Sequence, residues 1–183
     1  TFKRLAILLC MEEERIEKLQ KLYGALGQVL DGLWFTVLEK AVGFEKAYEV
    51  DDEVWRVYSR KEAKRLRSHF GFTTPGVEDI KNVLRYSLFA QSLEFELEVV
   101  QNSPLVIRLI ISSCKTYSGM VKIGRPEDQA QKICKGIGLT YFGNLMDEIS
   151  PGVQYKCIYT PYTRDEGEKN ACVWEFTFPN LSV

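Results

Sequence analysis

The chain contains 183 residues, with 24 basic and 25 acidic side chains, so its formal net charge at pH 7 is -1. This balance provides no general attraction for a polyanion, which argues against a nonspecific nucleic-acid binder and against a membrane-surface binder. Hydrophobic residues make up 45% of the chain, a proportion that excludes disordered and collagen-like proteins. We therefore expect one globular domain over residues 1–183.

The five cysteines and the first residues bear on the compartment. An odd number of widely spaced cysteines is unlike a disulfide-stapled secreted scaffold, so a reducing, cytoplasmic location is expected. The longest apolar run, Leu5 to Cys10, is far shorter than the ~20 residues that cross a bilayer and too short for a signal peptide. Met11 resembles a native start, so residues 1–11 are interpreted as an extension.

Residues 12–92 are predicted to form a helical half. Apolar residues recur every three to four positions over 12–30, which indicates an amphipathic helix. Asp31 is a suitable N-cap for a second helix that ends at Gly43.

Asp52 is expected to cap a third helix over residues 53–69 in the same way. The basic residues from Arg60 to Arg67 are interpreted as the solvated face of this helix. His69, the only histidine, would lie in its last turn, where the helix dipole favours a cation. Thr74 and Pro75 predict the start of a fourth helix, which reaches about residue 90.

Residues 93–178 are predicted to form the sheet-bearing half, because the apolar period changes to two at Leu93. A hairpin is expected with a three-residue loop at 101–103, which places Glu96 opposite Arg108. A fifth helix begins at Arg125, with a break expected near Gly136 and Gly138.

A second hairpin, 153–160 with 171–178, completes a ββαββ order after the helices. This segregation of helices and antiparallel hairpins predicts an α+β fold.

Four cysteines fall in the sheet-bearing half. A symmetric second hairpin places Cys157 opposite Cys172, with β-carbons about 4.5–5.5 Å apart, near enough for two thiolates to share one tetrahedral zinc. Cys134, on the helix that crosses this sheet, is a candidate third ligand. Cys114 is a candidate fourth ligand if a β-bulge turns it inward.

Two other interpretations of these cysteines stay open. Buried cysteines are common in cores and need no metal, and the chain has no C-x-x-C pair. A redox or catalytic thiol is the second alternative.

Aromatic residues suggest a ligand pocket between the helices and the sheet. Asp31 and Asp52 are candidate lining residues, although the interpretation as N-caps already explains both. Such aromatic groups more often belong to the core than to a ligand site. The side chains that we expect to line this pocket are Trp34, Trp55, Tyr141, Tyr155 and Trp174.

Several motifs resemble a known family. The N-terminal ones are Asp31-Gly32-Leu33-Trp34-Phe35, Gly43-Phe44-Glu45-Lys46-Ala47 and Asp52-Glu53-Val54-Trp55, and the C-terminal ones are Cys134-Lys135, Cys157 before Pro161, and Cys172-Val173-Trp174-Glu175-Phe176. Together they resemble an uncharacterised prokaryotic family. More distantly, the chain is similar to L-2-amino-thiazoline-4-carboxylate hydrolase-like proteins and to the 4-vinyl reductase domain.

Those two families are small-molecule-binding α+β modules whose cysteines are thought to hold a metal. The resemblance therefore implies a zinc site at Cys114, Cys134, Cys157 and Cys172.

Three functional hypotheses follow. The leading one is a small-molecule-binding or accessory module that has a cysteine-ligated zinc and takes a small apolar ligand. The second is a hydrolase of a small cyclic amidine or amide, with Glu175, Asp147 or Glu148 as general base. The third is a protein without metal that forms a homodimer through its N-terminal helices.

Overall fold

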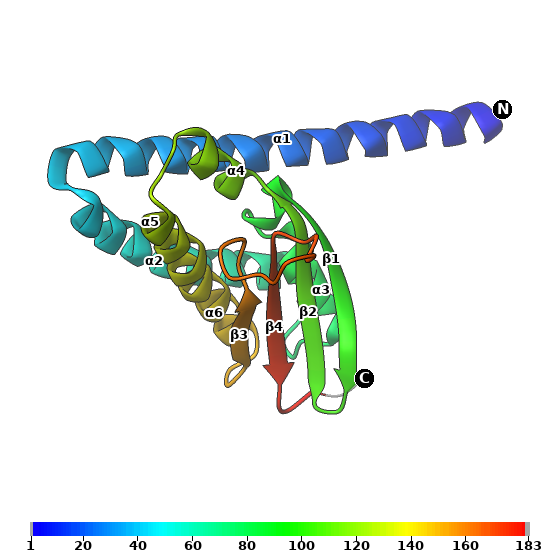
Figure 1. The fold of residues 1–183 in the computed structure, drawn as a ribbon. Helices are drawn as coiled ribbons and strands as arrows, with labels where there is room; N and C mark the ends of the chain where they lie inside the picture. Colours follow the sequence, from blue (N-terminus) through cyan, green and yellow to red (C-terminus); the bar gives the residue numbers. More distant parts are fainter. Residues whose placement is uncertain (1, 182–183) are drawn as a thin grey trace.

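The computed structural model describes the backbone of residues 2–181 and the side chains of residue 12 and residues 14–181 (Figure 1). Helices precede a four-stranded antiparallel sheet, so the fold is α+β. The elements are α1 (Phe2–Val42), α2 (Phe44–Phe70), α3 (Val77–Tyr86), the short 3-10 helix η1 (Ala90–Ser92), β1 (Leu93–Asn102), β2 (Leu105–Cys114), α4 (Lys115–Lys122), α5 (Glu127–Lys132), the π-helical turn η2 (Ile133–Ile137), α6 (Gly138–Ile149), β3 (Gln154–Tyr159) and β4 (Cys172–Phe178).

The sheet has the order β1-β2-β4-β3, with every neighbouring pair antiparallel. One face packs against helices, where Trp55 of α2 and Phe142 of α6 share a single core with Phe176 of β4. The opposite face is charged, and there Glu175 forms ion pairs with Arg108 and Lys156 at 2.8 Å each. The site must therefore be sought on the helical face or in the loops.

The N-terminal helices differ from the prediction. α1 is continuous through Asp31, and Asp52 lies inside α2, so neither residue is an N-cap. The break between the two helices is at Gly43, whose φ of 84° is easily adopted only by glycine. Asp52 instead accepts one hydrogen bond within α2, from Arg56 at 2.7 Å, and one from Thr140 of α6, which links the two helices. An aspartate therefore marks the start of a helix only where the residues before it are not already helical.

Helices α3 and α4 also differ from the prediction. α3 begins at Val77 after Gly76, rather than at Pro75. α4 follows β2 directly and had no predicted counterpart, because its eight residues are too few to show a helical period.

Both hairpin registers differ from those predicted. The loop between β1 and β2 holds only Ser103 and Pro104, and the register shifts between Val99 and Gln101, so Arg108 lies opposite Glu98 instead of Glu96. In the second hairpin Cys157 pairs with Trp174 rather than with Cys172. An irregularity between Cys157 and Tyr159 breaks the symmetry on which the predicted register depended.

Two glycines of the helix α5–η2–α6 permit close approach of neighbouring elements. A β-carbon at Gly138 would lie 2.6 Å from the Trp174 ring, and one at Gly136 would lie 1.9 Å from the Tyr48 hydroxyl oxygen. The predicted break at these glycines is the π-helical turn η2, so the helix is irregular there rather than interrupted.

Replacing Gly138 with alanine is expected to lower the free energy of unfolding by about 1–3 kcal/mol, because the added methyl group overpacks against Trp174. Gly32→Ala in α1 is the matched control, since a β-carbon at that position would have no neighbouring atom within 4 Å. That change should raise stability by about 0.5–1 kcal/mol. Urea denaturation of both variants measures the difference. Equal effects would show that Trp174 is not packed as described.

Candidate functional site

A cavity of about 60 Å³ lies between the helices and the end of the sheet at which β2 stops and β4 starts. Its walls include three cysteines, two carboxyl groups and two indoles: Cys114, Cys134, Cys172, Asp31, Asp51, Trp55 and Trp174. The volume suits an ion or a few water molecules, because one water needs roughly 10–15 Å³, whereas organic ligands need a few hundred.

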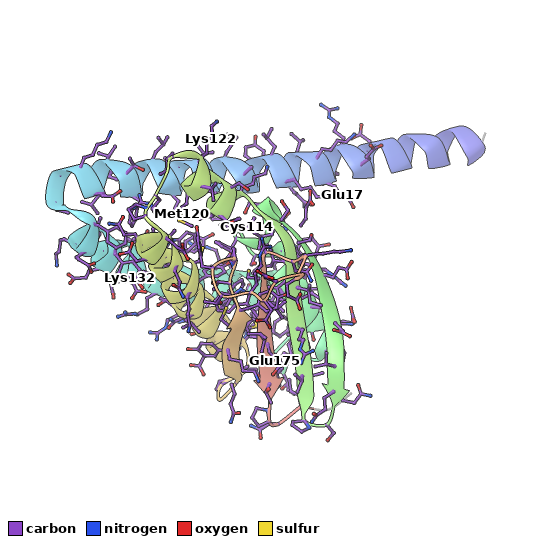
Figure 2. All side chains as sticks on the ribbon, in the orientation of Figure 1. Glu17, Cys114, Met120, Lys122, Lys132 and Glu175 are labelled. Atoms are coloured by element: carbon purple, nitrogen blue, oxygen red, sulfur yellow. The ribbon has the colours of Figure 1, made fainter. Side chains whose placement is uncertain are left out.

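Cys114 ends β2 and directly precedes α4, and Figure 2 shows it at this junction. A β-bulge between Glu94 and Phe95 of the partner strand places the extra residue just before it. The bulge turns Cys114 to the helical face, as predicted for this cysteine if it were a ligand. Its Sγ caps α4 by accepting a hydrogen bond from the backbone N–H of Tyr117 at 3.5 Å.

Cys134 and Cys172 reach the cavity from two other elements. Cys134 is the second residue of the π-helical turn η2, which widens the helix next to the cavity. Cys172 starts β4, pairs with Ile111 of β2 and accepts a hydrogen bond from the Trp174 indole at 3.3 Å. Segments as distant as 114 and 172 thus meet at one cavity.

Cys157 stands apart from the other three. It lies on β3 beside Trp174 and donates a hydrogen bond to the Tyr159 carbonyl at 3.2 Å, and it does not line the cavity. The predicted direct opposition of Cys157 and Cys172 is therefore wrong. In the described part of the chain, no three cysteine, histidine or carboxylate side chains are close enough, as they stand, to hold one metal ion.

The protonation of the four thiols follows from burial. Burial raises the pKa of Cys157 to about 11 and that of Cys172 to about 12, and it raises the pKa of Cys114 and Cys134 as well. After burial, the pKa of Cys134 is raised further by repulsion from Cys114, Cys172 and Cys157. Without a bound cation they are neutral at pH 7, and neutral thiols are poor nucleophiles.

Asp31 and Asp51 form a carboxyl pair beside the cysteines. Burial raises the pKa of Asp31 to about 6, and the Trp55 indole opposes this in part. Burial, followed by repulsion from Asp31 and Asp52, raises the pKa of Asp51 to about 7, again against the effect of Trp55. The turn at Gly43 brings the pair together from two helices.

The sequence analysis missed Asp51 and assigned Asp31 to a cap. A signal was present: Asp31 lies on the stripe of α1 that contains Gly24, Gln28 and Phe35, which is the stripe that faces the rest of the chain.

A second cavity, of about 360 Å³, lies between α1 and α2. It is mostly apolar and includes two of the three predicted tryptophans, Trp34 and Trp55. Asp31, Asp51 and Trp55 belong to both cavities, so they form the wall that the two have in common. At this size the groove between α1 and α2 is large enough for a small organic ligand.

The remaining predicted pocket residues are divided between the cavity and the core. Trp174 lines the cysteine cavity. Tyr141 is fully buried and donates a hydrogen bond to the Glu62 carboxylate at 2.7 Å, so it ties α6 to α2 within the core. Tyr155 packs against Gly143 of α6 and does not line the cavity. The five residues therefore do not form one pocket.

The predicted general bases are engaged elsewhere. Glu175 lies in ion pairs on the opposite face of the sheet, Asp147 accepts a hydrogen bond from the Gly152 backbone at 3.1 Å, and Glu148 lies 3.9 Å from Lys64. None of them lines the cysteine cavity. The carboxylates next to the cysteines are Asp31 and Asp51.

The basic residues of α2 are only partly a solvated face. Arg60 donates to Asn144 at 2.9 Å, and Arg67 donates to the Ile149 carbonyl at 2.8 Å, so both tie α2 to the end of α6. His69 lies in the last turn of α2, as predicted, and its ring packs on Phe70.

Comparison with known proteins identifies the family. Residues 13–178 match DUF6125, a family of unknown function. The chain belongs to DUF6125. No curated protein matches the chain. The more distant similarity to the hydrolase-like and 4-vinyl reductase families stays a prediction. In the described residues, no helix combines the length and the apolar character needed to cross a bilayer.

Proposed function

We propose that this member of DUF6125 is a small-molecule-binding or accessory module with a cysteine-ligated zinc ion. The observation that carries this proposal is the convergence of Cys114, Cys134 and Cys172, from three separate elements, on one cavity of about 60 Å³. Cys157 is the proposed fourth ligand, and a negative charge on it would raise the pKa of Cys134 and of Cys172. Four sulfur donors are the set that structural zinc prefers.

Four thiols are chemically suitable ligands for zinc. Among the described residues, however, no three candidate ligand side chains lie close enough together to hold one ion without moving. Cys134 and Cys114 lie at irregular backbone positions, in η2 and after a β-bulge. A zinc held by Cys114, Cys134, Cys157 and Cys172 would link the helix α5–η2–α6 to three of the four strands. The residues would lose their thiol protons on binding, so binding would weaken at low pH.

The ligand in this proposal occupies the groove between α1 and α2. Its walls are apolar apart from Asp31 and Asp51, so a small apolar molecule with one hydrogen-bond-donating end fits best. Unpaired cysteines at 114, 134, 157 and 172 support a cytoplasmic, reducing location.

The first test is the metal content of the purified protein. We expect about one zinc per chain by elemental analysis, and a lower melting temperature after treatment with a strong chelator. A protein without stoichiometric metal, in which all four thiols react rapidly with a thiol reagent, would contradict the zinc site.

A hydrolase of a small cyclic amidine or amide is the second candidate, and the pair Asp31 and Asp51 favours it. Carboxyl groups with pKa values of about 6 and about 7 are suited to general acid–base work near neutral pH. They line the cavity with three cysteines, whereas the fourth, Cys157, does not. X-ray absorption distinguishes the two candidates, because a catalytic zinc keeps one coordination position open and a structural zinc has four sulfur ligands.

We also propose that the protein is a homodimer. Large apolar side chains are exposed along the outward face of α1 from Ile16 to Val37, and a monomer rarely leaves so long an apolar surface in water.

A further inference from the structure

The outward face of α1 carries a regular row of large apolar residues, here called the outer stripe. Their exposed fractions run from 42% for Leu19 to 68% for Tyr23. The stripe consists of Ile16, Leu19, Tyr23, Leu26, Leu30, Leu33 and Val37.

The spacing of the outer stripe alternates strictly between three and four residues over three heptads. This is the a/d pattern of a coiled-coil seam, with a period of 3.5 residues that keeps the row facing a second helix. A helix that packed only on its own domain would need a single row of residues facing that domain. α1 has the outer stripe in addition to such a row.

The second row of α1 already packs within the chain. A β-carbon at Gly24 would lie 2.3 Å from the Cβ of Gln91, and Gln28 accepts a hydrogen bond from Thr116 at 2.8 Å. Phe35 is buried on the same side. The outer stripe has no partner among the described residues, because all seven of its members are exposed.

The N-terminal part of α1 extends past the body of the molecule (Figure 1). Every described side chain from residue 12 to Tyr23 is exposed, so this part makes little contact with the rest of the chain. An isolated helical segment of about 12 residues is marginal in water even with favourable composition. A second helix along the outer stripe would supply the missing stabilisation.

The area and the charge of the stripe fit a second copy of this chain. Seven half-exposed apolar side chains present on the order of 700 Å², near the ~800 Å² that each partner buries in a standard interface. The stripe contains no charged residue, so two copies meet without repulsion. In a two-fold dimer the same surface is used twice, which one self-complementary apolar row allows.

We infer that two copies of the chain associate by packing the outer stripe of one α1 against the outer stripe of the other. This inference rests on the proposed homodimer and specifies its interface. Of the stripe, only Leu30 also borders the groove between α1 and α2, so the cysteine cavity and most of the groove stay on the inner side of α1.

The test is sedimentation velocity of the full chain at increasing concentration. The natural chain is expected to reach twice its mass of 21.1 kDa. Leu19→Lys with Leu26→Lys should raise the dimer dissociation constant at least about a hundredfold, because four buried leucines become charged in the dimer. Neither residue lines the cysteine cavity or the groove between α1 and α2, so the monomer fold should be unchanged.

The matched control is Val57→Lys with Ile158→Lys, which adds the same charge at exposed apolar positions outside α1. It should dimerise like the natural chain. An independent readout is amide hydrogen exchange over residues 16–26, which should slow as concentration rises.

The outcomes separate the two proposals. A natural chain that stays monomeric overturns both the homodimer and the stripe interface. A dimer that survives the two leucine substitutions, or that shows no concentration-dependent protection of residues 16–26, leaves the homodimer standing and overturns the outer stripe as its interface.

Discussion

Replacing Cys134 with serine is expected to abolish stoichiometric zinc binding and to lower the melting temperature strongly. Cys134 is the only proposed ligand on a helix, so its loss detaches η2 from the ligands on the sheet. Structural zinc in small domains contributes roughly 10–16 kcal/mol of apparent binding free energy, so losing the site should cost several kcal/mol of stability. Elemental analysis and thermal denaturation, each with and without chelator, measure both effects.

Cys10→Ser is the chemically matched control for this experiment. The position lies in the N-terminal part of α1, which extends away from the sheet (Figure 1), and the variant should keep its zinc and its melting temperature. If the four cysteines are only core residues, Cys134→Ser should instead cost about 1–3 kcal/mol, the penalty for burying a hydroxyl in place of a thiol. A small loss that is insensitive to chelator would therefore reject the zinc site.

The contribution of Asp31 and Asp51 to the stability of the protein is expected to fall as pH rises from about 4 to about 8. Folding raises their pKa values from 3.8 to about 6 and about 7, so the native state binds more protons than the unfolded state in this range. The stabilisation that the protonated carboxyl groups provide is fully present below the unfolded pKa of 3.8. It is lost as pH rises through the native pKa values of about 6 and about 7. After allowance for solvent screening, we expect a loss of roughly 1–3 kcal/mol.

Urea denaturation near pH 5 and near pH 8 tests this expectation against the variant Asp31→Asn with Asp51→Asn. The amides cannot ionise, so the variant should lose most of the pH dependence and should be more stable than the natural chain near pH 8. Glu62, whose pKa burial also raises, is unchanged in both proteins, and its contribution cancels in the comparison. An equal pH dependence in both proteins would contradict a buried carboxyl pair.

The elements of the fold were largely predictable because their patterns are local. The change of apolar period at Leu93 correctly located the sheet, and the alternation over 153–160 and 171–178 correctly located β3 and β4. The helix end predicted at Gly43 is confirmed, but the start of the next helix was misplaced at Asp52, because aspartate is common both at N-caps and inside helices. The predicted hairpin registers were wrong for a related reason. Bulges and loop lengths depend on packing between strands, and the alternation of apolar residues within one strand carries no information about them.

The candidate site was likewise predictable only in part. The sequence by itself nominated the four cysteines at 114, 134, 157 and 172, because residue type is a property of single segments, whereas Cys114 needed a β-bulge to face the cavity. Only the tertiary structure separated Cys157 from the cavity, since its position depends on the register with β4. Only the turn at Gly43 brought Asp31 and Asp51 together and buried them, and burial is what changes their pKa values. Proximity and desolvation arise when distant segments pack, so no local pattern could have shown them.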